Sequence, residues 1–285
     1  MNKRDIVMTD RIPLRTTPPT GHGRARGLVS RPSGEQIRSV SYAPSAAFEP
    51  FVAAYWGGIW DLRDASPHVT ELLGDPCAHF VFERGGPHHD ARLVGVWTRL
   101  WKRKLEGVGR VWGVKLRAGA LRAFVAASAS DFTNRIVPLA DVFPRGIRTL
   151  HKKVTSTDDD AEAFAAIEAW LSSVRRPSDP QIKMAVSLVD RIARDPAIMT
   201  VDTLASVSGL APRALQRLFR DYVGGSPKWA IRRNRLQEAA LRIERGERES
   251  LADLAALLGY ADQAHLARDF RNAVGKSPSA FRKML

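Results

Sequence analysis

The C-terminal part of the 285-residue chain contains two copies of one pattern, and this repeat restricts its fold more than any other feature. Residues 204–210 (LASVSGL) match residues 254–260 (LAALLGY) at an offset of 50 positions. After a one-residue insertion the match resumes at Leu215 and Leu266 and continues for about a dozen positions. A solenoid needs at least about three repeats to bury a continuous core. The repeat therefore predicts a small module that is present twice.

Each copy has the parts of a helix-turn-helix motif. A short apolar helix ends at Gly209 or Gly259, where the chain must turn tightly before a second helix. In the first copy, Pro212 suits the first turn of that second helix, because the amide hydrogen that proline lacks has no partner there. In the second copy, Asp262 is a suitable N-cap. The two motifs are expected at about 201–223 and 251–274.

The second helix of each copy, called the reading helix below, has an apolar and a polar side at helical spacing. Arginine and glutamine on an exposed helix suit the DNA major groove, because they make paired hydrogen bonds to guanine and adenine respectively. A solvated polar face is the alternative and is usual for surface arginines, but two copies in a basic chain favour DNA reading. The first reading helix presents Arg213, Gln216, Arg217 and Arg220, and the second presents Gln263, Arg268 and Arg271.

One long helix is predicted between the copies, at about 227–245. Its apolar residues are spaced to pack against both motifs, and Arg232, Arg233 and Arg235 are expected to meet DNA phosphates. A rigid helix fixes the distance between the reading helices, and major-groove faces on one side of DNA lie about 34 Å apart. One chain is therefore expected to read two adjacent major-groove segments.

These residues resemble the AraC/XylS family of bacterial transcription regulators. The resemblance covers roughly residues 181–285, and its most specific part is 252–282, with Gly259-Tyr260, Asp262-Gln263 and Ser277-Pro278. In that family the first motif usually makes the more sequence-specific contacts. The resemblance therefore implies that Arg213, Gln216 and Arg217 read bases, that Gln263, His265 and Arg268 take the corresponding places in the second motif, and that Arg220 and Arg271 contact phosphate or solvent. For His265, a capping or packing role is an equal alternative.

The N-terminal half has a different character. Short runs rich in Val, Trp and Phe, separated by turn residues, predict strands within 54–60, 79–82, 93–97 and 111–116. Helices are predicted at 121–127 and 160–174. The double-proline segment 175–180 is the predicted boundary. The fold class is therefore α+β, with a mainly β N-terminal domain at 41–177 and an all-α DNA-binding domain at 178–285.

The N-terminal half also resembles, less specifically, the sensing and dimerising domains of the same family, many of which are cupin-like β-barrels followed by helices. His79 and the pair His88-His89 are the candidate metal ligands near strands, but adjacent histidines in a turn point in different directions. No metal and no cofactor are expected. Five tryptophans are expected either to line a pocket for a small organic effector or to form plain core or dimer interface. They are Trp56, Trp60, Trp97, Trp101 and Trp112.

The formal net charge of +14 indicates an anionic partner. Residues 1–40 hold eight basic and three acidic side chains among several prolines and glycines, which predicts a mostly disordered basic tail. Residues 178–285 hold 18 basic and 12 acidic side chains, so most of the excess lies elsewhere. The placement of a few arginines, rather than net charge, therefore carries the DNA prediction. No run approaches the ~18–20 apolar residues of a membrane helix, and we expect a cytoplasmic protein without membrane contact.

Three functions compete. The resemblance implies a one-component regulator that binds double-stranded DNA as a homodimer, activates transcription with RNA polymerase and responds to a small-molecule effector. An architectural DNA-binding protein without ligand sensing is the alternative. A DNA-repair methyltransferase with a related helical module needs a four-cysteine zinc site, and the single cysteine, Cys77, excludes that form. We find no phosphate loop, nucleophile elbow or HExxH motif, so no catalytic residue and no enzyme activity are expected.

Overall fold

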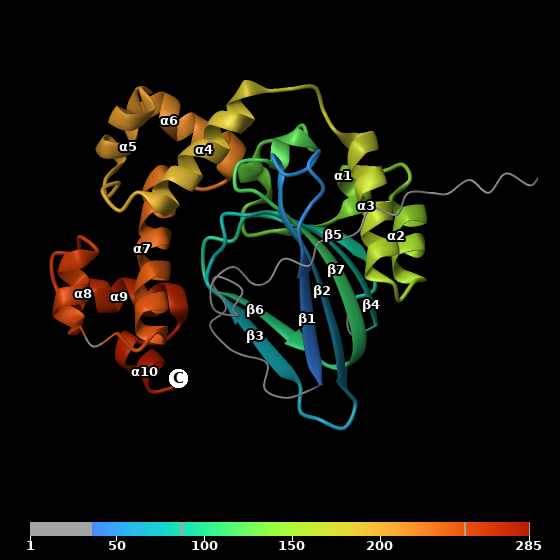
Figure 1. Cartoon of the computed structure of the whole chain (residues 1–285), viewed down its shortest axis with the longest axis horizontal. Helices are drawn as coiled ribbons and strands as arrows, with labels where there is room; N and C mark the ends of the chain where they lie inside the picture. The colour runs from blue at the N-terminus through green and yellow to red at the C-terminus, as the bar shows by residue number, and fades with distance from the viewer. Residues whose placement is uncertain (1–35, 86–87, 248, 285) are drawn as a thin grey trace, which may run out of the picture.

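The computed structural model describes residues 36–85, 88–247 and 249–284, and it has a β-rich half followed by a helical half (Figure 1). The predicted α+β class is therefore confirmed. Most of the predicted tail, residues 1–40, lies outside the described residues. Its end was predicted wrongly, because strand β1 begins at Ile37 and pairs along its length with β2. That pairing depends on a partner strand elsewhere in the chain, which local composition does not encode.

Eight strands form two antiparallel sheets in the described part of the β-rich half. The larger sheet has the order β1-β2-β7-β4-β5-β8, and the smaller one pairs β3 with β6. The predicted runs at 54–60, 79–82 and 111–116 lie inside strands β2, β4 and β7, and the run at 93–97 only begins inside β5. The strands are β1 (Ile37–Tyr42), β2 (Val52–Leu62), β3 (His68–Leu72), β4 (His79–Gly85), β5 (Ala91–Val94), β6 (Trp101–Leu105), β7 (Gly107–Leu116) and β8 (Ile136–Pro138).

Helices cover one face of the six-stranded sheet. These are α1 (Leu139–Val142), α2 (Ile147–Thr155) and α3 (Asp160–Val174), of which α3 was predicted with these bounds. The Asp159 side chain caps α3, and Phe164, Ile167 and Leu171 point into the core. The predicted helix at 121–127 is wrong, because only Leu121–Ala123 forms a 3-10 turn. That segment is buried on nearly all sides, so packing rather than helix periodicity decides its path.

The tryptophans do not share one pocket. Trp112 belongs to the cluster under α2 and α3, whereas Trp60 belongs to a separate cluster with Val81, Leu105 and Val111. Trp60 is paired with Gly109 of β7, three positions before Trp112, and successive residues of a strand point to opposite sides, so the two indoles lie on opposite faces of the six-stranded sheet. Of the two alternatives given for the five tryptophans, a single shared pocket is wrong, and core packing accounts for Trp60 and Trp112.

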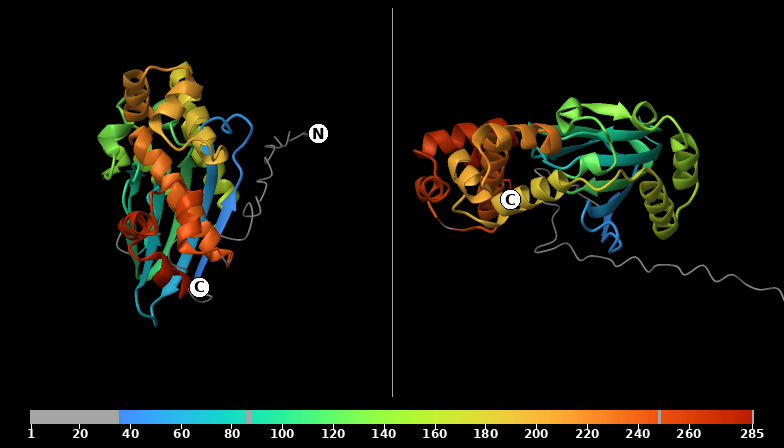
Figure 2. Two further views of the ribbon diagram at one scale, coloured as in Figure 1. Left: turned by 90° about the vertical axis from the view of Figure 1, so that its left-hand side faces the viewer. Right: turned by 90° about the horizontal axis from the view of Figure 1, so that it is seen from above.

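The helical half contains seven α-helices among its described residues. Helix α7 spans Pro227–Glu244, as the long helix was predicted, and stands between two groups of short helices (Figures 1 and 2). We call α5, α6 and the π-helical turn η3 the first module, and α8, α9 and α10 the second module. Their bounds are α4 (Pro180–Arg194), α5 (Val201–Ser208), α6 (Pro212–Leu218), η3 (Phe219–Val223), α8 (Leu251–Leu257), α9 (Gln263–Val274) and α10 (Pro278–Arg282).

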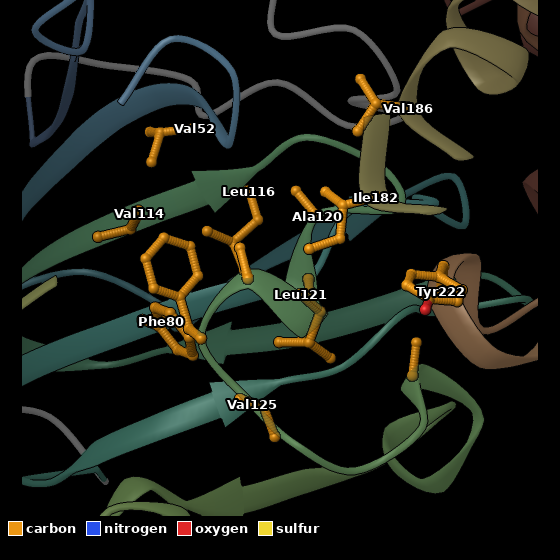
Figure 3. Packing of buried hydrophobic residues seen from close by; sticks show 14 of the residues in the cluster. Val52, Phe80, Val114, Leu116, Ala120, Leu121, Val125, Ile182, Val186 and Tyr222 are labelled. Carbon is orange, nitrogen blue, oxygen red and sulfur yellow. The ribbon is translucent and has the colours of Figure 1, made fainter. Parts of the chain in front are cut away.

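The first module shares a hydrophobic core with the β-rich half. Figure 3 shows Ile182, Val186 and Tyr222 from the helical half beside Ala120 and Leu121. Phe219 and Leu215 extend the same core into the module. The second module has a separate core. In the described part of the chain, no helix has the length and apolar character needed to cross a membrane.

Candidate DNA-binding surface

The first module holds its reading helix by local rules of the sequence. Gly209 ends α5 in the left-handed conformation with φ 67°, and Pro212 occupies the first turn of α6. Leu215 and Leu218 are buried in the core behind the helix. The side chains on the opposite side, predicted to face DNA, are exposed and line an open hollow of about 480 Å³. They are Arg213, Gln216, Arg217 and Arg220.

Arg220 differs from the other three residues of this surface, because a carboxylate already holds it. Its Nε donates to Oδ1 of Asp221 at 2.8 Å, and this contact lowers the pKa of the Asp221 carboxyl. Asp221 also lies 3.4 Å from the Ser128 hydroxyl of the β-rich half. Because this pair uses part of its hydrogen-bonding capacity, Arg220 is less available to a base edge than the other three side chains.

The second module repeats the arrangement. Gly259 turns the chain with φ 68°, and Oδ1 of Asp262 accepts a hydrogen bond from the His265 backbone amide at 2.6 Å, as an N-cap does. Leu266 and Phe270 are fully buried on the inner side. The four side chains of α9 that were predicted to face DNA are all exposed: Gln263, His265, Arg268 and Arg271.

His265 combines two of the roles considered for it. Its backbone amide completes the cap, and its ring packs edge-on against Tyr260, with ring centroids 5.1 Å apart. The side chain nevertheless remains exposed at the start of the reading helix. Packing on Tyr260 restricts the ring without withdrawing it from the surface.

Two arginines of α7 do not serve the purpose predicted for them. Nε of Arg233 donates to the carbonyl oxygen of Gly74 at 2.7 Å, and the same side chain contacts Gln237. Arg235 donates to the carbonyl oxygen of Met199. The prediction that these two meet phosphates is wrong, because backbone carbonyl oxygens engage both of them. Arg232 is about half exposed, and its Nη1 lies 3.8 Å from Asp269 Oδ1.

The candidate metal ligand His79 and the single cysteine, Cys77, both lie beside Asp75. Nδ1 of His79 accepts a hydrogen bond from Trp56 Nε1 at 3.2 Å, and burial lowers the pKa of His79 to about 4. Burial and the nearby Asp75 raise the pKa of the Cys77 thiol to about 12, so it is protonated at neutral pH. In the described part of the chain, no three His, Cys, Asp or Glu side chains are grouped to hold a metal ion.

Two known families match separate parts of the chain. Residues 204–284 match a family described as a helix-turn-helix domain, and residues 40–138 match one described as a domain of unknown function, DUF6597. The β-rich half therefore matches a family to which no function has been assigned.

Several known regulators are similar to the helical half. Regulatory protein SoxS of Salmonella typhimurium is 34% identical over 87 residues, which are 30% of this chain and 80% of that protein. The probable transcription factor PqrA of Proteus vulgaris is 34% identical over 29% of this chain and 67% of its own length. For an uncharacterized HTH-type transcriptional regulator of Haemophilus influenzae, the match covers only 28% of that protein.

Longer matches include the β-rich half. The HTH-type transcriptional activator RhaS of Pectobacterium atrosepticum is 30% identical over 217 residues, which are 76% of this chain and 66% of that protein. The solved structure of ToxT from Vibrio cholerae O395 covers 88% of this chain and 99% of its own, at 10% identity and a TM-score of 0.40. The helix-turn-helix half is thus the part that known regulators match most closely.

Proposed function

The chain belongs to the AraC/XylS family of transcription regulators, and from this membership we propose that it is a one-component activator controlled by a small-molecule effector. It carries the DNA-binding helix-turn-helix domain of that family and is a regulator rather than an enzyme. Residues 178–285 bind a specific double-stranded DNA site in this proposal. Residues 41–177 sense the effector and join two chains into a homodimer, and RNA polymerase is the partner in activation.

The repeated polar face of the two reading helices carries the DNA-binding part of this proposal. In each module, buried leucine and phenylalanine hold the helix from behind, while arginine and glutamine stand exposed in front. The first helix offers Arg213, Gln216 and Arg217, and the second offers Gln263 and Arg268. These side chains have the donor geometry that reads guanine and adenine edges in the major groove.

Selection of DNA by the full-length chain tests the specificity. A random duplex library is enriched on the protein, and affinities for the recovered sequence and a scrambled sequence are then compared at several salt concentrations. We expect a clear preference for the recovered sequence. We also expect an affinity that falls steeply with salt, because arginines that bind phosphates displace counterions from the DNA. Equal affinity for both duplexes would favour the architectural alternative.

The effector part of the proposal needs its own measurement. A ligand controls the chain only if it binds one conformation more tightly than another. Thermal unfolding of the full-length chain with a set of small molecules should reveal one that raises the melting temperature in a concentration-dependent manner. The same compound should change the affinity for the selected DNA, and a stabilising compound without that effect would contradict control by an effector.

A further inference from the structure

The two modules are attached to the β-rich half in different ways. One group of contacts around the second module comes from Glu71, Leu73 and Gly74, at and just after strand β3, and from Arg233 and Lys276 in the helical half. We call these five residues the latch. In Figure 1 the β3–β6 sheet lies on the side of the β-rich half that faces α9 and α10.

Leu73 is the apolar part of the latch. Its side chain is 4% exposed and belongs to the core of the second module, together with Leu236, Ile243, Leu254 and Phe270. It is the residue of the β-rich half in that cluster of buried side chains. One leucine from the β-rich half therefore completes the core of the second module.

Two polar contacts flank Leu73. Nζ of Lys276 lies 3.0 Å from Oε2 of Glu71, and Nε of Arg233 donates to the Gly74 carbonyl oxygen at 2.7 Å. Glu71 is also paired with Lys102 of β6 at 2.7 Å, and these lysines lower the pKa of its carboxyl. The Glu71 and Lys276 side chains are 14% and 29% exposed, so solvent screens this pair only in part.

The latch leaves the reading face of the second module uncovered. Gln263, His265 and Arg268 are exposed while Glu71 and Leu73 are in place. Docking and DNA contact therefore use different sides of the module and are compatible. Since the first module already shares the core of the β-rich half, the latch fixes the second module on the same support.

The smaller sheet also connects the latch with the interior of the β-rich half. Arg103 of β6 forms an ion pair with the fully buried Glu83, and its neighbour Lys102 holds Glu71. Lys102 and Glu71 are directly paired in the register of the two strands. Strand β6 thus contacts the buried Glu83 of β4 through Arg103 and the latch residue Glu71 through Lys102.

We propose that the latch is a positioning contact through which the β-rich half completes the second module and holds its reading helix ready for DNA. The position of the second module then depends on the conformation of the β3–β4 connection, whereas the position of the first module depends on the shared core. The DNA-binding part of this inference rests on the proposed function, but the structural part does not.

Hydrogen exchange of the full-length chain without DNA tests the structural part. We expect Leu73→Ala to accelerate the exchange of α8, α9 and α10 amides at least about tenfold, with little change in α5 and α6, since local opening is controlled by local packing. Leu62→Ala is the matched control, because Leu62 is equally buried at 5% exposure but packs in the sheet cluster. Unchanged exchange of the second module in Leu73→Ala would overturn the proposal.

A charge exchange tests the positioning of the reading helix, and it remains informative if Leu73→Ala does not fold. We expect Glu71→Lys to weaken binding to the selected DNA by roughly threefold to tenfold, although it adds positive charge, and the added Lys276→Glu substitution to restore part of the loss. Glu106→Lys is the control, because it breaks an exposed pair with Lys104 at 2.6 Å in the same region. Unchanged binding by Glu71→Lys would overturn the proposal. Stronger binding would also overturn it, because it would indicate that the latch inhibits DNA binding. If no specific DNA is recovered, the proposed function fails, while hydrogen exchange still decides the structural part.

Discussion

The two modules have nearly the same local structure and very different surroundings. Each has a short helix, a left-handed glycine and a reading helix with a buried inner side. The core around Phe219 in the first module continues into the β-rich half, whereas the core around Phe270 is separate and, among the described residues, its buried cluster includes Leu73 from that half. A duplicated sequence can therefore produce two similar reading helices that are supported by different cores.

The largest expected effect comes from truncating one buried phenylalanine in each of the two cores. Phe219→Ala and Phe270→Ala each remove a fully buried ring, and such truncations cost about 3–5 kcal/mol. We expect Phe219→Ala to lower the stability of the β-rich half and the first module together, because they share one core. Phe270→Ala should loosen the second module alone. Chemical denaturation combined with hydrogen exchange distinguishes these outcomes, and identical exchange patterns in the two variants would contradict the comparison.

The next effect concerns DNA reading. Arg217→Ala and Arg268→Ala each remove an exposed guanidinium from equivalent positions of the repeat, and loss of a paired base contact costs about 1–3 kcal/mol of discrimination. We expect each variant to relax specificity at a different base of the selected site. The matched control is Arg194→Ala, which removes an equally charged, exposed side chain of α4. A uniform loss across all sequences would instead indicate phosphate contacts.

The turn glycines should give a smaller effect. Gly209 and Gly259 have positive φ, and a side chain in that conformation costs roughly 1–2 kcal/mol. A Cβ at Gly209 would meet no atom within 4 Å, whereas a Cβ at Gly259 would lie 2.6 Å from the Met199 sulfur. We therefore expect Gly259→Ala to be somewhat more destabilising than Gly209→Ala in thermal unfolding. Equal melting temperatures would show that Met199 moves aside freely.

The smallest expected effect is a pH dependence of the latch. The lysines around Glu71 hold the pKa of its carboxyl below the usual value, so its contribution to stability is present above about pH 4.3 and is lost as pH falls further. For a partly exposed pair this amounts to roughly 0.2–1 kcal/mol. Acidification should therefore loosen the second module relative to the first in a limited proteolysis series using an acid-active protease. Glu71→Gln should remove this pH dependence of the second module. A pH profile in that variant that matches the profile of the unsubstituted chain would contradict the prediction.

Arg220 shows how the sequence distinguishes the copies at single positions. Asp221 follows it and binds it, whereas Asn272 follows the equivalent Arg271. The first copy therefore places a carboxylate beside its last polar-face arginine, and the second copy does not place one there. We expect Arg271 to interact with phosphate more strongly than Arg220 does.

Strand prediction succeeded where the strands are apolar and central. The runs within β2, β4 and β7 were recognised from Val, Phe and Trp, because these strands pack in the core on one or both faces. Strands β1, β3 and β6 were missed, since their charged and polar residues, such as those of Trp101–Leu105 (WKRKL), have no strong local pattern. These strands exist because a neighbouring strand satisfies their backbone hydrogen bonds.

By itself, the sequence determined the two modules, the long helix between them and the exposed arginines and glutamines of the reading helices. These features follow from helix periodicity, turn glycines and caps, which act within a few residues. The tertiary structure decided that Arg233 binds Gly74, 159 positions away, and that Lys276 binds Glu71, 205 positions away. It also placed Trp60 and Trp112 on opposite faces of a sheet. Such contacts depend on which distant surfaces meet after folding, and no local period encodes that information.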